Sequence, residues 1–205
     1  MPYYAAMKSL PVIFDSESKL QKSCLVGGLV FCSFSGIWGS LDILLSSAPF
    51  YYNSSIIGWF ALVGIFGTLF TGVIGRCADR YGVKLMLKII PYFLAVSFVL
   101  ISQTLSRIAF LIVAMVVLDI SSRTSLVTNQ LVNYTLGSDT RSRVNSLFMC
   151  SYFLFGSIGT SIGAWAAVNY GWCGVAVLGV CCSLSVVIIN LFWNTVTSTA
   201  AFNQS

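Results

Sequence analysis

The sequence predicts an all-α membrane protein that crosses the bilayer with six helices. Apolar residues make up 57% of the 205 residues and charged residues only 8%, whereas a soluble domain carries about 25% charged residues. Mean hydropathy is +0.89. A membrane-spanning helix needs roughly 20 apolar residues, so the chain has room for six such helices joined by short polar links.

The composition also argues against several function classes. Histidine is absent, which removes histidine-dependent catalysis and histidine metal sites. The 7 cysteines form no C-x-x-C pair and are interpreted as small hydrophobic residues. We therefore expect no enzyme, cofactor or metal. The net charge of +5 is assigned to the links that flank the membrane and not to nucleic-acid binding.

The chain enters the membrane after a mixed segment. Residues 1–22 alternate apolar and polar positions and predict a cytoplasmic or interfacial segment, with a disordered tail as the alternative. The first helix is expected at about 23–47, where one face carries Ser35, Gly39, Asp42 and Ser46. A face with a carboxylate cannot be turned to lipid without cost.

The second helix, expected at about 55–75, is predicted to pack closely on a neighbour because of its glycines. These are Gly58, Gly64, Gly67 and Gly72. The run from Gly75 to Lys84 then forms a polar, cationic link in which Gly82 can adopt positive φ and Gly75 allows a turn or a close approach. Asp79 stands where its carboxylate could face a helix N-terminus. The alternative is an ordinary basic loop without a special role.

The third helix, at about 86–104, carries Pro91 in its expected first turns, where a missing N–H is tolerated. The fourth, at about 108–134, is apolar in its first half and polar in its second. Asp119 and Arg123 are spaced i, i+4 and can pair within the helix. The polar stripe on this helix consists of Asp119, Ser122, Arg123, Gln130 and Asn133.

A charge at membrane depth costs roughly 2.5–3.5 kcal/mol. Two interpretations of the stripe therefore stay open. It lines a watery substrate or proton pathway, or the charged pair neutralises itself and packs against a neighbouring helix.

The fifth helix, at about 144–168, presents polar and small residues on one face. Its glycines predict close packing against another backbone, while Asn145 and Tyr152 are candidates for a wet surface. The face consists of Asn145, Tyr152, Gly156, Gly159 and Gly163. The sixth helix, at about 173–194, is expected to be apolar all round and peripheral, and residues 195–205 to form a cytoplasmic tail.

The basic residues predict the orientation, because they gather on the cytoplasmic side of a membrane. If the Gly75–Lys84 link is cytoplasmic, six helices put both termini inside, and only Arg107 lies outside. The predicted cytoplasmic cations are Lys8, Lys19, Lys22, Arg76, Arg80, Lys84, Lys88, Arg141 and Arg143.

Several of these motifs resemble one known family. The pattern G-x-x-x-D-R-x-G-x-K over Gly75–Lys84 resembles the signature loop of the major facilitator superfamily, with Cys77 and Val83 departing from it. Asp119, the Asn129-Gln130 pair, the run from Arg141 to Ser146 and the Ser151-Tyr152-Phe153 triplet resemble the carboxy-terminal half of drug or arabinose efflux permeases.

The resemblance implies a fold of twelve helices in two halves, each with 3+3 inverted repeats. This chain is similar to the second half, with 1–22 as the end of the central cytoplasmic loop and 23–194 as the six-helix domain. The gating loop would use Gly75, Asp79, Arg80, Gly82 and Lys84. The cavity and proton-coupling candidates are Asp42, Asp119, Arg123, Gln130, Asn133, Asn145 and Tyr152.

These observations favour half of a secondary transporter in the inner (plasma) membrane. It would export a drug, a sugar or another small solute by alternating access, with proton coupling. Its partners would be lipid, the solute, and a second six-helix half or another copy of itself. The alternative is a truncated or split-gene remnant without transport activity, or a membrane scaffold that binds a partner. A six-helix channel is a third hypothesis, without a selectivity-filter sequence. The substrate and the coupling ion stay open.

Overall fold

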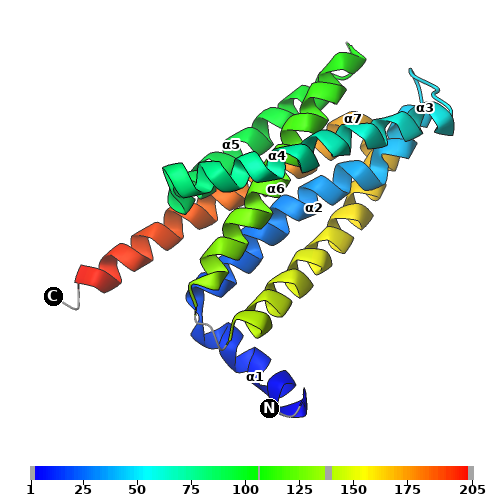
Figure 1. Ribbon diagram of the computed structural model, residues 1–205. Helices are drawn as coiled ribbons and strands as arrows, with labels where there is room; N and C mark the ends of the chain where they lie inside the picture. Colours follow the sequence, from blue (N-terminus) through cyan, green and yellow to red (C-terminus); the bar gives the residue numbers. More distant parts are fainter. Residues whose placement is uncertain (1–2, 106, 137–139, 203–205) are drawn as a thin grey trace.

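A computed structural model describes the backbone of residues 3–105, 107–136 and 140–202, and these residues form a bundle of helices (Figure 1). The predicted all-α class is therefore confirmed. The elements in order are α1 (Tyr3–Ser16), α2 (Ser18–Ser46), α3 (Ser54–Trp59), the 3₁₀ turn η1 (Phe60–Leu62), α4 (Val63–Tyr81), α5 (Val83–Ser102), α6 (Ile108–Tyr134) and α7 (Arg141–Phe202).

Within the described residues, 4 helices are long and apolar enough to cross a membrane, namely α2, α5, α6 and α7. The last of these is two helices in one continuous element. Gly171 has φ 58° and ψ −143°, and there the chain turns back on itself (Figure 1). Helical segments thus occur at all the predicted positions. The six membrane crossings and the 3+3 inverted repeat within these six helices stay predictions.

The helix boundaries differ from the expected ones mainly near the two ends of the chain. The segment 1–22 contains α1, and α2 begins at Ser18. The expected tail 195–205 is helical as far as Phe202. Residues 137–139, between the fourth and fifth expected helices, lie outside the described residues.

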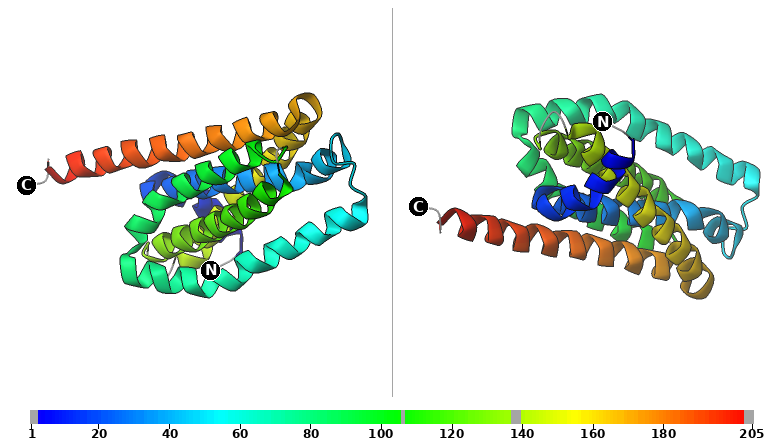
Figure 2. Two further views of the ribbon diagram at one scale, coloured as in Figure 1. Left: turned by 90° about the horizontal axis from the view of Figure 1, so that it is seen from above. Right: turned by 90° about the horizontal axis from the view of Figure 1, so that it is seen from below.

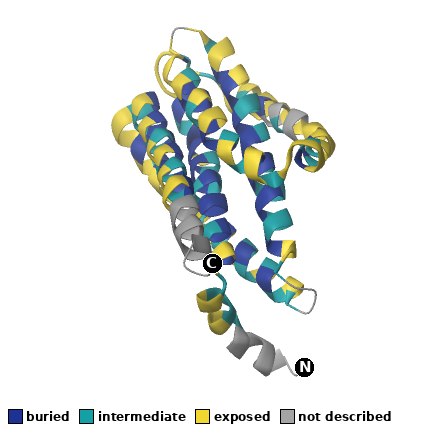
Figure 3. Cartoon of the chain, turned by 90° about the vertical axis from the view of Figure 1, so that its left-hand side faces the viewer, coloured by how far each residue is buried: buried dark blue, intermediate teal, exposed yellow. Residues whose placement is uncertain are grey.

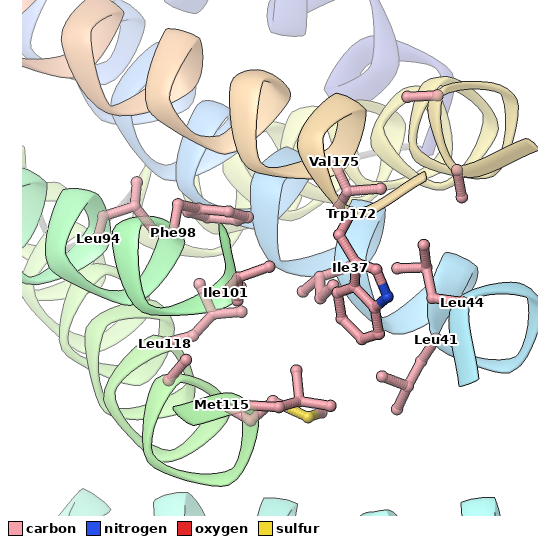
Figure 4. Close-up of a cluster of buried hydrophobic side chains, with 14 of the residues drawn as sticks. Ile37, Leu41, Leu44, Leu94, Phe98, Ile101, Met115, Leu118, Trp172 and Val175 are labelled. Atoms are coloured by element: carbon pink, nitrogen blue, oxygen red, sulfur yellow. The ribbon is translucent and has the colours of Figure 1, made fainter. Parts of the chain in front are cut away.

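The centre of the bundle is an apolar cluster to which α2, α5, α6 and α7 each contribute (Figure 4). Ile37 and Leu41 come from α2, Phe98 from α5, Met115 from α6 and Trp172 from α7. Figure 2 shows α4 and the second half of α7 on opposite sides of the bundle, with α2 and α6 between them. Buried residues lie on the faces by which the helices meet (Figure 3).

The closest packing in the fold is between α2 and the first half of α7. A Cβ atom added at Gly159 would collide with the backbone carbonyl of Cys32, and one added at Gly163 with that of Gly36. Only glycine permits such an approach of two helix backbones. The predicted small-residue contact of the fifth helix is confirmed, and its partner is α2.

The prediction that the second helix packs closely through its glycines is wrong for the described positions. A Cβ at Gly58 or Gly72 would meet nothing within 4 Å, and one at Gly64 only Trp38, at 3.9 Å. Gly67 lies outside the residues whose side-chain surroundings are described. The reason is that α4 lies at the edge of the bundle, with Leu69 70% exposed.

The predicted Gly75–Lys84 loop is largely helical. The helix α4 continues through Tyr81, and the single residue Gly82, with φ 82°, joins it to α5. The positive φ expected at Gly82 is confirmed. The role expected for Gly75 is wrong, because this residue lies inside α4 with open space around it. A helix satisfies its own backbone, and long polar side chains at its end can reach water.

The position expected for Pro91 is also wrong. Because α5 begins at Val83, Pro91 lies in the helix interior. Proline has no N–H, so the carbonyl of Leu87, four residues earlier, loses its helical partner. Asn190 on α7 donates its side-chain amide to this carbonyl at 3.2 Å. A polar group from a neighbouring helix thus repairs the backbone defect.

The sixth predicted helix is consequently not apolar all round. Besides Asn190, buried Ser183 donates a hydrogen bond to the carbonyl of Pro91 at 2.6 Å. Leu184, Ile188 and Leu191 are exposed on the same helix. The second half of α7 therefore has an outward apolar face, as expected, and a polar line of contact with α5 that the sequence reading missed.

The contact between α2 and α7 predicts a position-specific effect of adding one methyl group. Gly159→Ala should lower the free energy of unfolding by about 2 kcal/mol through overpacking. Gly72→Ala, at the open position on α4, should be neutral or stabilising by up to about 1 kcal/mol, because alanine favours helix. Unfolding by sodium dodecyl sulfate, followed by circular dichroism, measures both. Equal effects would contradict the packing described.

The hydrogen bond between α7 and α5 predicts that the effects of Asn190 and Pro91 substitutions on stability are coupled, which a double-mutant cycle measures. Asn190→Leu should cost about 1 kcal/mol, the usual size of a hydrogen bond between membrane helices. In a Pro91→Ala background the new N–H should bond to Leu87, so the cost of Asn190→Leu should fall toward zero. Asn169→Leu, whose amide bonds only within its own helix, is the matched control. If Asn190→Leu costs as much stability in the Pro91→Ala background as in the native chain, Asn190 does not compensate for the N–H that Pro91 lacks.

Candidate functional site

The candidate site is the polar second half of α6, which lies inside the bundle. Asp119 is 1% exposed, and it is followed by a series of buried hydroxyl and amide side chains. Burying polar groups among apolar ones is costly unless they are paired. The buried polar residues of this helix are Asp119, Ser121, Ser122, Thr124, Ser125, Thr128, Asn129 and Asn133.

Asp119 and Arg123 form the predicted ion pair near the middle of α6. Nε of Arg123 lies 3.8 Å from Oδ1 of Asp119. The two side chains differ in environment, because that of Arg123 is 38% exposed and that of Asp119 1%. The second carboxylate oxygen, Oδ2, is buried and has no hydrogen-bond partner among the described residues. The pair therefore joins a buried acid to a half-exposed cation.

Tyr152 connects this pair to the other two helices of the site. Its hydroxyl lies 3.5 Å from that of Ser122, next to Arg123. Its ring stacks on Phe31 of α2 with centroids 4.0 Å apart. Tyr152 is buried, so the ring forms part of a packed junction of α2, α6 and α7 with its polar end at α6.

Further along α6, and at Asn145 on α7, several polar groups lack partners, although Asn129 donates to Ser125. Gln130 donates only a long contact to the sulfur of Met149, at 3.7 Å. Both amide atoms of Asn133 and Oδ1 of Asn145 are buried without a hydrogen-bond partner in the described part of the chain. Buried polar groups are normally paired with protein or water. These side chains therefore mark a place for water or a polar ligand.

The other predicted residues lie outside this group. Asp42 is exposed near the end of α2, and no described ion pair or hydrogen bond joins it to Asp119. Asp79, Arg80 and Lys84 are exposed around Gly82, where the guanidinium of Arg80 lies 5.5 Å from the ring centre of Tyr81. Among the described residues, no hydrogen bond or ion pair joins these gating residues to the stripe on α6.

The sequence analysis did not identify a row of aromatic side chains on α2. Phe31, Phe34 and Trp38 follow one another at 5.8 Å and 6.0 Å between ring centres. Their i, i+3, i+7 spacing places them on one helix face. This spacing was the available signal, but aromatic residues at helical spacing are common in any membrane helix.

Comparison with known proteins finds relatives whose names describe them as transporters. The chain is 31% identical over 199 residues to the uncharacterized transporter YgaY of Escherichia coli, in strains K12 and O157:H7. The chain is similar to proteins named as transporters. It is also 24% identical over 178 residues to the "Probable transporter SCO4007" of Streptomyces coelicolor. No protein-family model matches the chain.

These similarities cover nearly all of the chain but only part of each relative. The alignment with YgaY of strain K12 includes 93% of this chain and 48% of that protein. The alignment with SCO4007 includes 85% of this chain and 40% of that protein. The chain thus spans about half the length of the curated relatives it matches. Together with the apolar helices, the similarity supports a multi-pass membrane protein.

The ion pair predicts that the effects of Asp119 and Arg123 substitutions on the free energy of unfolding are not additive. Arg123→Gln removes the partner of a buried carboxylate and should cost about 1–3 kcal/mol, less than for a fully buried pair because Arg123 is half exposed. Asp119→Asn in the same chain should recover most of that loss, since no buried charge then remains. Denaturant unfolding of the two single variants and the double variant at neutral pH measures the coupling. Additive losses would mean that the two residues act independently.

Proposed function

We propose that this chain is one half of a secondary transporter of the major facilitator type, which moves a small solute by alternating access. The observation that carries the proposal is the pair of buried Asp119 and half-exposed Arg123 near the middle of α6, with unpaired polar atoms further along the same helix. Transporters bind their solutes near the middle of the membrane, between two structural halves. Ionisable residues at that depth are expensive, and they usually serve a function.

The half-length match to the relatives supports the need for a second half. So do the open glycines on α3 and α4, because Gly58 on α3 and Gly72 and Gly75 on α4 leave space for another backbone where the described part of this chain supplies none. Small residues are the usual points of close helix contact in membranes. The partner would be a second six-helix half or another copy of this chain.

Asp119 is the proposed proton-binding group. Its Oδ2 atom has no described partner, so a proton can be added there without breaking a hydrogen bond. Protonation would remove the negative charge and release Arg123 from the pair. Such a change alters the electrostatics between the helices, and it can bias a transporter toward one of its two states. We place the protein in the inner membrane with both termini cytoplasmic, and the transport direction as efflux.

The second candidate is a remnant or scaffold without transport activity. Alternating access requires two halves that rock against each other, so six helices without a partner half would not transport by this mechanism. Reconstitution distinguishes the candidates. Proteoliposomes would hold this chain alone, or this chain with the first six helices of the E. coli relative, under an imposed pH gradient. Gradient-driven flux of dyes or sugars in either preparation supports the proposal, and flux in neither favours the second candidate.

The proposed proton site predicts that one substitution removes the response of transport to a pH gradient. Asp119→Asn should abolish acceleration of flux by the pH gradient, because the amide cannot take up a proton near neutral pH. Flux down a solute gradient alone should persist within about tenfold, since the site itself remains. Asp42→Asn, at the other acid within a predicted span, is the matched control and should retain the pH response. A normal pH response in Asp119→Asn would remove Asp119 from this role.

A further inference from the structure

Arg123 has unused hydrogen-bonding capacity at membrane depth. A guanidinium carries five N–H donors in a planar fork, and the described contact to Asp119 engages only Nε, at 3.8 Å. Among the described residues, neither terminal nitrogen of Arg123 has a hydrogen-bond partner. Because the side chain is 38% exposed while its acid partner is buried, the accessible charge of the pair is the positive one.

An aromatic surface begins beside this cation. The hydroxyl of Tyr152 meets Ser122, the residue before Arg123. From Tyr152 the rings continue through Phe31 at 4.0 Å and through Phe34 and Trp38 on α2. Phe153 packs against both Tyr152 and Phe31 at 5.9 Å and is 56% exposed.

The same surface also has a polar atom without a partner. Nε1 of Trp38 is buried and donates no hydrogen bond within the described part of the chain. Indole N–H groups usually find an acceptor when they are buried. The row of rings therefore has a half-exposed cation beside one end and a buried, unpaired N–H donor at the other.

We propose that Arg123 and the half-buried rings of Phe31, Phe34 and Trp38, with Tyr152 packed behind Phe31, form a binding site for an organic anion with a flat, apolar body. A carboxylate or sulfonate matches the fork geometry of a guanidinium, which can donate two parallel hydrogen bonds to it. The apolar body would stack on the aromatic rings. This inference rests on the proposed transport function and names the class of solute.

The strongest alternative is that the site binds an organic cation. Aromatic faces attract cations, and exposed Asp42 lies one helical turn beyond Trp38 on α2. The observations favour an anion because Asp119, the acid paired with Arg123, is buried, so the accessible charge of that pair is the guanidinium. A cationic solute would have to approach the half-exposed guanidinium.

Equilibrium binding tests the inference directly. The full chain in lipid nanodiscs would be dialysed against three radiolabelled probes with the same ring system. These are 2-naphthoate, 2-naphthylmethylammonium and 2-naphthylmethanol, with empty nanodiscs subtracted. We expect naphthoate to bind most tightly. Arg123→Gln should weaken naphthoate at least about tenfold, which is 1.4 kcal/mol, and leave the alcohol unchanged. Arg107→Gln, at the exposed end of α6, is the matched control and should leave all three unchanged.

Two further variants keep the test decisive. Asp119→Asn should tighten naphthoate binding, because the guanidinium loses its competing carboxylate. If Arg123→Gln binds none of the probes, Arg123→Lys decides, since it keeps the charge and should still prefer the anion over the alcohol. Tighter binding of the ammonium probe, or naphthoate binding that is insensitive to Arg123, would overturn the inference.

The outcomes also separate this inference from the proposed function. Arg123-dependent naphthoate binding without flux in any reconstitution would support the anion site and contradict transport. Gradient-driven flux of another solute, without naphthoate binding, would support transport and overturn the anion site.

Discussion

The fold depends on one constraint, which is that a polar group within the hydrocarbon must find its partner inside the protein. Pro91 shows how strictly the chain obeys it. The missing N–H frees the carbonyl of Leu87, and Asn190 comes from a different helix to bond it. The same constraint makes the polar half of α6 informative. There the chain leaves buried atoms of Asp119 and Asn133 without partners among the described residues, so a ligand, water or proton is the remaining way to satisfy them.

The helices differ in how firmly they are held. Gly159 and Gly163 bring α7 against the backbone of α2, and Tyr152 and Phe31 extend this contact toward α6. By contrast, α4 lies at the edge and exposes both glycines and large apolar side chains. A rigid α2–α7 unit beside a loosely held helix is compatible with a body that rocks against a partner half. The proposed anion site lies on the rigid side, where the geometry of Arg123 and the rings would be kept through such a movement.

Much of this arrangement could be predicted from the sequence. Apolar runs of the right length located the helices, and i, i+4 spacing predicted the Asp119–Arg123 pair. The failures share a cause, since spacing says which residues share a face but not what that face meets. The glycines of the second and fifth helices look alike in sequence, yet only those of the fifth meet a backbone. Similarly, the polar and small residues within Gly75–Lys84 predicted a loop. A helix that exposes its polar side chains is equally compatible with this composition, and α4 continues through Tyr81.

The central claim is that the polar face of α6 lines a water-accessible path and is not merely packed. Cysteine accessibility tests it most directly in a variant that lacks the native cysteines. Gln130→Cys lies on the polar stripe, and Val113→Cys lies on the exposed apolar surface of the same helix. A membrane-impermeant maleimide applied to proteoliposomes should label Gln130→Cys much faster than Val113→Cys, because only a hydrated thiol ionises and reacts. Equal, slow labelling at both positions would mean that the stripe is dry, and it would contradict a transport path along α6.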